Sequence, residues 1–138
     1  MSKRPSILIV DDEESIRVSL KILFEKENYN VEIAKNASMA IKKLKTTIFN
    51  IILTDIMMQG KTGIDLLKIL KKDYPNIAVL LMTGYASIDT AMESVSLGAM
   101  DYLVKPICKE TLLFNIGRCL ELKKKQKNLD PINNTPYD

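Results

Sequence analysis

Four places along the chain carry polar side chains suited to phosphoryl chemistry, each at the end of an apolar run: Asp11 with Asp12, then Asp55, Thr83 and Lys105. Carboxylates that are brought together near a core repel one another, which raises their pKa values unless a cation neutralises them. The chain contains no histidine, and a set of oxygen ligands favours a hard ion such as Mg²⁺, which accepts one or two carboxylates and keeps several waters. The acidic residues therefore indicate a magnesium site.

Two further side chains could hold a phosphoryl group at that site. Lys105 supplies a compact, mobile positive charge, and Thr83 supplies a hydroxyl that can donate to an anionic oxygen. Because phosphoryl transfer depends mainly on positioning and charge neutralisation, this small set is sufficient if one of the carboxylates is the nucleophile.

The scaffold that must bring these residues together is predicted from hydrophobic periodicity. Short β-branched runs, typical of buried strands, alternate with segments whose apolar residues recur at helical spacing. The predicted strands are residues 7–10, 31–34, 51–54, 78–82 and 102–104. Parallel neighbours need right-handed crossovers, so the pattern predicts a doubly wound α/β fold with a five-stranded parallel sheet. Ligands bind beyond the carboxyl ends of such strands, where the polar residues stand.

Composition limits the remaining possibilities. A chain of 138 residues that is 46% hydrophobic is long enough for one domain, which we place at residues 1–122. Residues 123–138 are predicted to be a polar helix end and a disordered tail or linker stub. The net charge of +3 is too small to indicate nucleic-acid binding. With neither a signal-peptide core nor a membrane span in the sequence, we expect a cytoplasmic location, and Cys108 and Cys119 are interpreted as ordinary thiols.

The polar residues also carry a family resemblance. The motifs are the pair Asp11-Asp12, the stretch from Asp55 to Gly63, Thr83-Gly84, and Tyr102 with Lys105-Pro106. Over roughly residues 5–122 the chain resembles the receiver domain of bacterial two-component response regulators, which implies a flavodoxin-like (βα)5 receiver fold.

The resemblance implies a role for each acidic residue. Asp55 would be the phosphoacceptor and also a metal ligand. Asp12 would bind Mg²⁺ directly, Asp11 would bind it largely through water, and Met57 would contribute only its backbone carbonyl.

The resemblance likewise implies a switch. Lys105 would pair with the phosphoryl group and Thr83 would swing in to hydrogen-bond it. Tyr102 would then rotate inward to fill the space that Thr83 leaves, and the Lys105–Pro106 peptide bond would be cis.

Partners follow from the same resemblance. A sensor histidine kinase would supply the phosphoryl group, and the chain would be no enzyme beyond its own phosphotransfer and autodephosphorylation. The surface that responds would include the helix around residues 88–95, the strand 102–104 and the last helix, and it would serve a homodimer or a downstream effector. We expect no direct contact with nucleic acid or membrane.

Two segments, residues 81–87 and 97–102, are similar to receivers of enhancer-binding, nitrogen-regulation-type transcription activators. Such activators carry an ATPase domain and a DNA-binding domain after the receiver. We therefore expect a role in transcription regulation, with the chain either a fragment of such a regulator or a single-domain one.

The sequence departs from the family pattern at two positions. Gln59 stands where a proline is usual, which affects the rigidity of the loop after Asp55. Cys108 stands where a capping aspartate is expected and is predicted to be a weaker helix cap.

Two alternative functions make different demands on the sequence. A receiver-like interaction module that works without phosphorylation would be marked by loss of an acidic or lysine position, and none is lost. An aspartyl phosphatase would need a second aspartate, as its acid, two residues after the nucleophile, but position 57 is a methionine. In a flavodoxin-like nucleotide site, the acidic residues 11–14 would repel the phosphates of the ligand.

Overall fold

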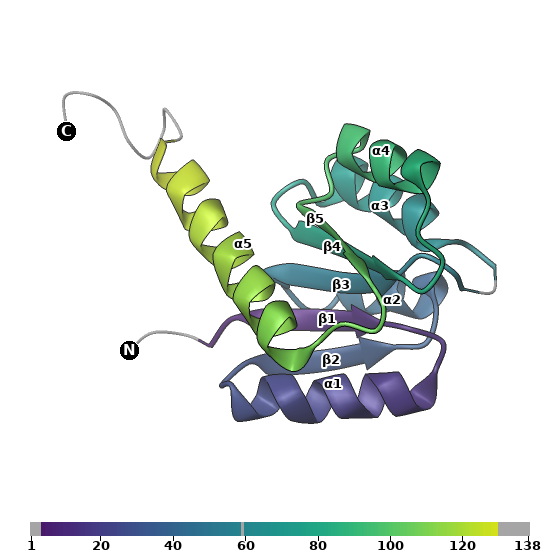
Figure 1. The fold of residues 1–138 in the computed structure, drawn as a ribbon. Helices are drawn as coiled ribbons and strands as arrows, with labels where there is room; N and C mark the ends of the chain where they lie inside the picture. Colours follow the sequence, from purple (N-terminus) through teal and green to yellow (C-terminus); the bar gives the residue numbers. More distant parts are fainter. Residues whose placement is uncertain (1–3, 59, 130–138) are drawn as a thin grey trace. The chain divides into compact units, whose positions relative to one another are not determined.

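The computed structural model describes residues 4–58 and 60–129, and within them five strands alternate with five helices (Figure 1). The strands are β1 (Ser6–Val10), β2 (Asn30–Ala34), β3 (Ile51–Asp55), β4 (Ala78–Thr83) and β5 (Asp101–Val104). The helices are α1 (Glu14–Lys26), α2 (Ala37–Leu44), α3 (Gly63–Asp73), α4 (Ile88–Ser96) and α5 (Lys109–Leu129). The chain divides into two compact units, one ending at Pro106 and the other beginning at Ile107.

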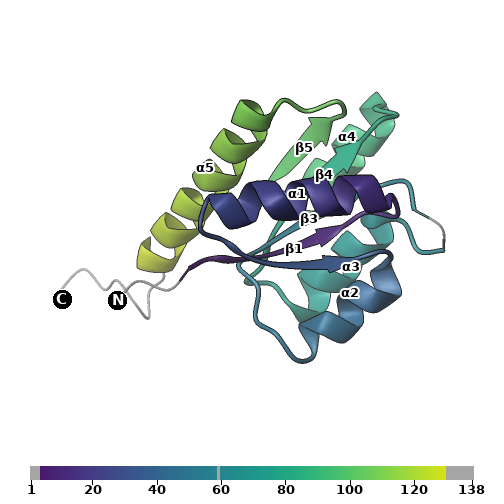
Figure 2. The same ribbon diagram turned by 90° about the horizontal axis from the view of Figure 1, so that it is seen from below.

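The first unit contains the whole sheet. All four strand pairings are parallel, and the strand order is β2-β1-β3-β4-β5. Figure 2 shows α1 on one face of this sheet and α2 and α3 on the other. The predicted doubly wound, five-stranded parallel sheet is confirmed, and each predicted strand agrees with the observed one to within one residue at either end.

Alternation along the strands divides the core between the two faces. Leu8, Ile52 and Val79 lie side by side in the register of β1, β3 and β4 and pack with α2 and α3 in one buried cluster. Their neighbours Ile7 and Ile51 point to the opposite face and are equally buried. Every residue of β3 and β4 is buried, as expected for central parallel strands covered on both faces.

Periodicity in the sequence predicts that Ile88, Ala91, Met92 and Val95 form the core-facing stripe of α4, and the structure agrees only for Ala91. Ile88, Met92 and Val95 are 78%, 66% and 70% exposed, although their spacing is that of a core-facing stripe. The helix turns its small side chains inward: Ala91 of the predicted stripe is half-buried, and Ser94, which lies outside that stripe, is fully buried. The short side chains allow close packing, and the large ones remain on the surface.

The second unit contains α5. At its start Cys108 acts as a cap, since its sulfur accepts a hydrogen bond from the Thr111 amide at 3.4 Å. Residues 123–129 continue the helix, whereas the predicted tail from residue 130 and the loop residue Gln59 lie outside the described residues. The domain boundaries therefore stay a prediction. Within the described ranges, the helices are too short or too polar to span a bilayer.

Candidate functional site

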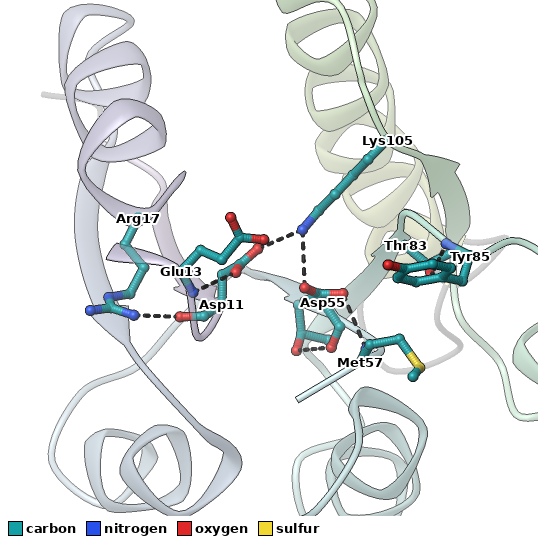
Figure 3. Close-up of polar contacts among 9 residues, drawn as sticks. Asp11, Glu13, Arg17, Asp55, Met57, Thr83, Tyr85 and Lys105 are labelled. Atoms are coloured by element: carbon teal, nitrogen blue, oxygen red, sulfur yellow. Dashed lines mark hydrogen bonds and ion pairs between the residues drawn. The ribbon is translucent and has the colours of Figure 1, made fainter. Parts of the chain in front are cut away.

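The carboxyl ends of the central strands meet at one edge of the sheet and carry the predicted site residues. Asp55 is the last residue of β3, and it pairs in register with Met82, the residue before Thr83 at the end of β4. Asp11 follows the last residue of β1, and Lys105 follows the last residue of β5. The sheet therefore brings together residues that are up to 94 positions apart in the sequence (Figure 3).

Lys105 lies between two buried carboxylates. Its Nζ donates to Asp11 Oδ2 at 2.9 Å and to Asp55 Oδ2 at 3.0 Å (Figure 3). The side chains of Asp11 and Asp55 are 0% and 7% exposed, so both ion pairs are largely shielded from solvent. Burial acts to lower the pKa of Lys105, but the hydrogen bonds and charges of the two carboxylates outweigh it and raise that pKa above its usual value.

Three carboxylates form a candidate metal centre. Asp11, Asp12 and Asp55 each offer an oxygen, and the three oxygens lie within 4.8 Å of one another. Lys105 pairs with Asp11 and Asp55, and no ion pair of Asp12 is seen among the described residues, so the acidic groups outnumber the ammonium. Asp12 is exposed while the other two are buried, so an ion could enter from solvent and still reach the buried oxygens. The donors and their charge fit a hard divalent cation.

The pKa of Asp55 is raised in the folded protein. Burial is the largest influence and raises the pKa above the usual 3.8, and the charge of Asp11 raises it further. The hydrogen bond and charge of Lys105 and a hydrogen bond from the Met57 amide act in the opposite direction without cancelling the effect. The ionised form of Asp55 is therefore less favourable in the folded protein than in the unfolded chain.

A pH dependence follows from the raised pKa. The folded chain holds a proton on Asp55 more tightly than the unfolded chain, so this group lowers stability as pH rises from about 3.8 through the folded pKa. In chelator, the unfolding free energy of the parent minus that of Asp55→Asn should decrease between pH about 4 and neutral pH. Thermal melts of both proteins across this range measure the difference, and adding Mg²⁺ at neutral pH should restore stability to the parent more than to the variant. A difference that rises with pH would contradict this account.

The loop after β1 is held by contacts that the sequence pattern does not predict. Arg17 Nη1 donates to the backbone carbonyl of Asp11 at 2.7 Å, and the amide of Glu13 donates to Asp11 Oδ1 at 2.9 Å (Figure 3). These contacts fix both ends of Asp11 while leaving Oδ2 free for Lys105. A cation one turn into α1, on the side of the acidic pair, is the sequence signal that could have identified Arg17.

The start of α3 is held against the end of β3. The amide of Gly63 donates to the Ile56 carbonyl at 2.9 Å, and Thr62 and Asp65 form a reciprocal capping box at the start of α3. A Cβ atom at Gly63 would overlap the carbonyl oxygen of Asp55 and would lie 2.8 Å from Ile56 Cα. The helix can approach the strand end this closely because residue 63 is a glycine.

The remaining predicted residues lie around this centre. The Met57 amide donates to Asp55 Oδ1 at 3.1 Å, while the metal-ligand role of its carbonyl stays a prediction. Thr83 is buried, and its Oγ1 accepts a hydrogen bond from the Tyr85 amide at 3.0 Å (Figure 3). The hydroxyl of Tyr102 bonds to Thr90 of α4. The structure thus gathers the three aspartates and Lys105, and it places Thr83 and Tyr102 in separate contacts. The Lys105–Pro106 peptide bond is cis, as the resemblance implied.

Comparison with known families agrees with this geometry. A family described as the response regulator receiver domain matches residues 7–116, which include all the site residues discussed above. The chain therefore belongs to the response regulator receiver domain family.

Individual proteins and solved structures are also similar to this chain. The chain is 37% identical over 94% of its length to the transcriptional regulatory protein ZraR of Klebsiella oxytoca, of which it spans 29%. Among solved structures, a CheY-like receiver domain protein from Methanospirillum hungatei JF-1 matches with a TM-score of 0.86 and 36% identity, covering 89% of this chain and 98% of that one. The beryllofluoride-activated NtrC4 receiver domain dimer matches with a TM-score of 0.81 and 36% identity, covering 86% and 98%.

Proposed function

We propose that this receiver domain accepts a phosphoryl group on Asp55 from the phosphohistidine of a sensor kinase. The observation that carries the proposal is the buried Asp11–Lys105–Asp55 bridge beside the exposed Asp12. It supplies a carboxylate, a cation and spare acidic oxygens at one strand edge. These are the components that phosphoryl transfer requires.

In the proposed reaction an oxygen of Asp55 attacks phosphorus, the bond from phosphorus to the histidine nitrogen breaks, and the electron pair stays with the imidazole. The product is an acyl phosphate. Lys105 Nζ, already within 3.0 Å of Asp55 Oδ2, offsets the charge on the transferred group. Asp11, Asp12 and Asp55, with the Met57 carbonyl, would hold Mg²⁺, which would neutralise phosphoryl oxygens when bound. In this proposal the chain catalyses only its own phosphotransfer and dephosphorylation.

The proposed response begins at Thr83. Its hydroxyl would leave the Tyr85 amide, which it contacts now, and donate to a phosphoryl oxygen. We propose that the surfaces of α4, β5 and α5 change in consequence, and that an effector or a second copy of the chain binds them. The exposed Ile88, Met92 and Val95 of α4 offer an apolar surface for such a partner, and a dimer is known for the similar NtrC4 receiver. The similarity to the transcriptional regulatory protein ZraR supports a final effect on transcription. A cytoplasmic location is part of the same proposal.

Incubation with acetyl phosphate tests the proposal directly. The purified chain should gain the mass of one phosphoryl group in the presence of Mg²⁺ and none in the presence of chelator, because the acidic cluster cannot neutralise an incoming phosphate by itself. Intact-protein mass spectrometry measures the gain. Absence of a mass gain with Mg²⁺ would favour the alternative of an interaction module that works without phosphorylation.

A further inference from the structure

A small network of hydroxyl groups joins β5 to the first turn of α4. The Tyr102 hydroxyl lies 2.7 Å from Thr90 Oγ1 and accepts a hydrogen bond from the Ser87 amide at 3.4 Å. Thr90 Oγ1 also lies 2.9 Å from Ser87 Oγ and donates to the Ser87 carbonyl at 3.2 Å. Thr90 is thus the residue at which Tyr102 and the helix cap meet.

The hydrogen atoms of this network can be assigned consistently. The Ser87 carbonyl can only accept, so the single hydroxyl hydrogen of Thr90 points to it. Thr90 Oγ1 then accepts from the Tyr102 hydroxyl, which is the shortest contact of the set. Tyr102 therefore donates its only hydroxyl hydrogen to Thr90. The hydroxyl hydrogen of Thr90 is already donated to the Ser87 carbonyl.

The loop between β4 and α4 connects this hydroxyl network to the candidate site. Thr83 Oγ1 holds the Tyr85 amide, and Tyr85 lies two residues before Ser87, the cap of α4. A movement of Thr83 towards a phosphoryl group would release the Tyr85 amide and free the segment that carries Ser87. Ser87 and Thr90 are hydrogen-bonded to each other and to Tyr102. A displacement of Ser87 therefore reaches Tyr102 through these hydrogen bonds.

We infer that the Thr90 hydroxyl is the positioning group that holds Tyr102 against α4 in the unphosphorylated protein and releases it when Thr83 moves. This inference rests on the proposed phosphorylation of Asp55. Thr90 touches none of the acidic residues in the described contacts, so it acts through Tyr102 and not on the phosphoryl group itself.

The test compares Thr90→Val, which keeps the shape and deletes the hydroxyl, with Thr90→Ser, which keeps the hydroxyl. Fluorotyrosine-labelled proteins are followed by fluorine NMR, and the Tyr102 resonance is identified by its loss in Tyr102→Phe. Without phosphate donor, the Tyr102 resonance of Thr90→Val should already be displaced towards its position in the phosphorylated parent. Loss of one hydrogen bond should shift the equilibrium by about fivefold. Thr90→Ser should match the parent.

Ser94→Ala is the matched control. The Ser94 hydroxyl donates to the Thr90 carbonyl at 2.6 Å, so this variant also loses one hydroxyl contact within α4 but leaves the Tyr102 contact in place. Its Tyr102 resonance should be that of the parent. An unshifted resonance in Thr90→Val, or an equal shift in Ser94→Ala, would overturn the inference.

A second measurement covers the case in which Thr90→Val does not fold. Tyr102→Phe deletes the same contact from the other side and should raise the rate of phosphoryl uptake from acetyl phosphate by about fivefold. An unchanged rate in Tyr102→Phe also overturns the inference. A parent protein that takes up no phosphoryl group contradicts the proposed function, whereas a phosphorylated parent with parent-like variants contradicts only the role of Thr90.

Discussion

Replacement of Asp55 by asparagine is expected to abolish phosphoryl uptake by this chain. The asparagine Oδ1 can still accept a hydrogen bond from the Met57 amide, so the backbone of residues 55–57 should be unchanged. The amide cannot act as the nucleophile, and the acidic cluster loses one of its three carboxylates. In Mg²⁺ and acetyl phosphate the mass of the variant should therefore remain that of the unmodified protein, while its far-ultraviolet circular dichroism should match the parent.

Asp73→Asn provides the control for this loss. Asp73 is the exposed last residue of α3, and its replacement makes the same change of charge away from the acidic cluster. This variant should be phosphorylated as fully as the parent. Uptake by Asp55→Asn at the parent rate would show that another residue is the acceptor.

Gly63→Ala is expected to destabilise the fold strongly, although it adds only one methyl group. The new Cβ would overlap the backbone of Asp55 and Ile56, and a backbone cannot rotate away as a flexible side chain can. Either α3 or the end of β3 must shift, at a cost of about 3 kcal/mol, typical of overpacking in a well-packed interior. Urea unfolding measures this cost. Because the displaced carbonyl belongs to Asp55, phosphoryl uptake by the folded fraction should also slow.

Gly84→Ala is a suitable comparison because Gly84 follows β4 at the same edge of the sheet. A Cβ at Gly84 would meet no atom within 4 Å, so its unfolding free energy should stay within about 0.5 kcal/mol of the parent value. Equal stabilities of Gly63→Ala and Gly84→Ala would show that α3 does not press on the end of β3.

Much of the architecture could be predicted from the sequence because both main signals are local. Short β-branched runs such as residues 51–54 favour strands buried on both faces, and segments of helical periodicity separate one run from the next. Once the sheet is parallel, residues at strand ends must share an edge. This is why Asp11, Asp55 and Lys105 could be placed together before their contacts were known.

Other features depend on pairings that periodicity does not encode. The stripe containing Ile88 and Met92 has the spacing of a buried face, yet α4 packs through Ser94, because the choice of face is made by neighbouring elements. The Thr90–Tyr102 contact joins two residues on different elements, and neither residue type predicts the other. The constraint at Gly63 is likewise visible only when the backbone of Asp55 lies beside it.

The position of β3 at the middle of the sheet has a consequence for how such a protein can diversify. Asp55 lies on a strand that is buried along its full length between two others. Tyr102 lies on β5, one of the two edge strands, and α4 presents its large apolar side chains to solvent. A substitution at Asp55 must fit neighbours on all sides of a central strand, whereas a substitution on the exposed face of α4 must fit neighbours on one side only. Under the proposed function, substitutions on the exposed face of α4 can therefore change which partner protein binds without altering the acidic cluster.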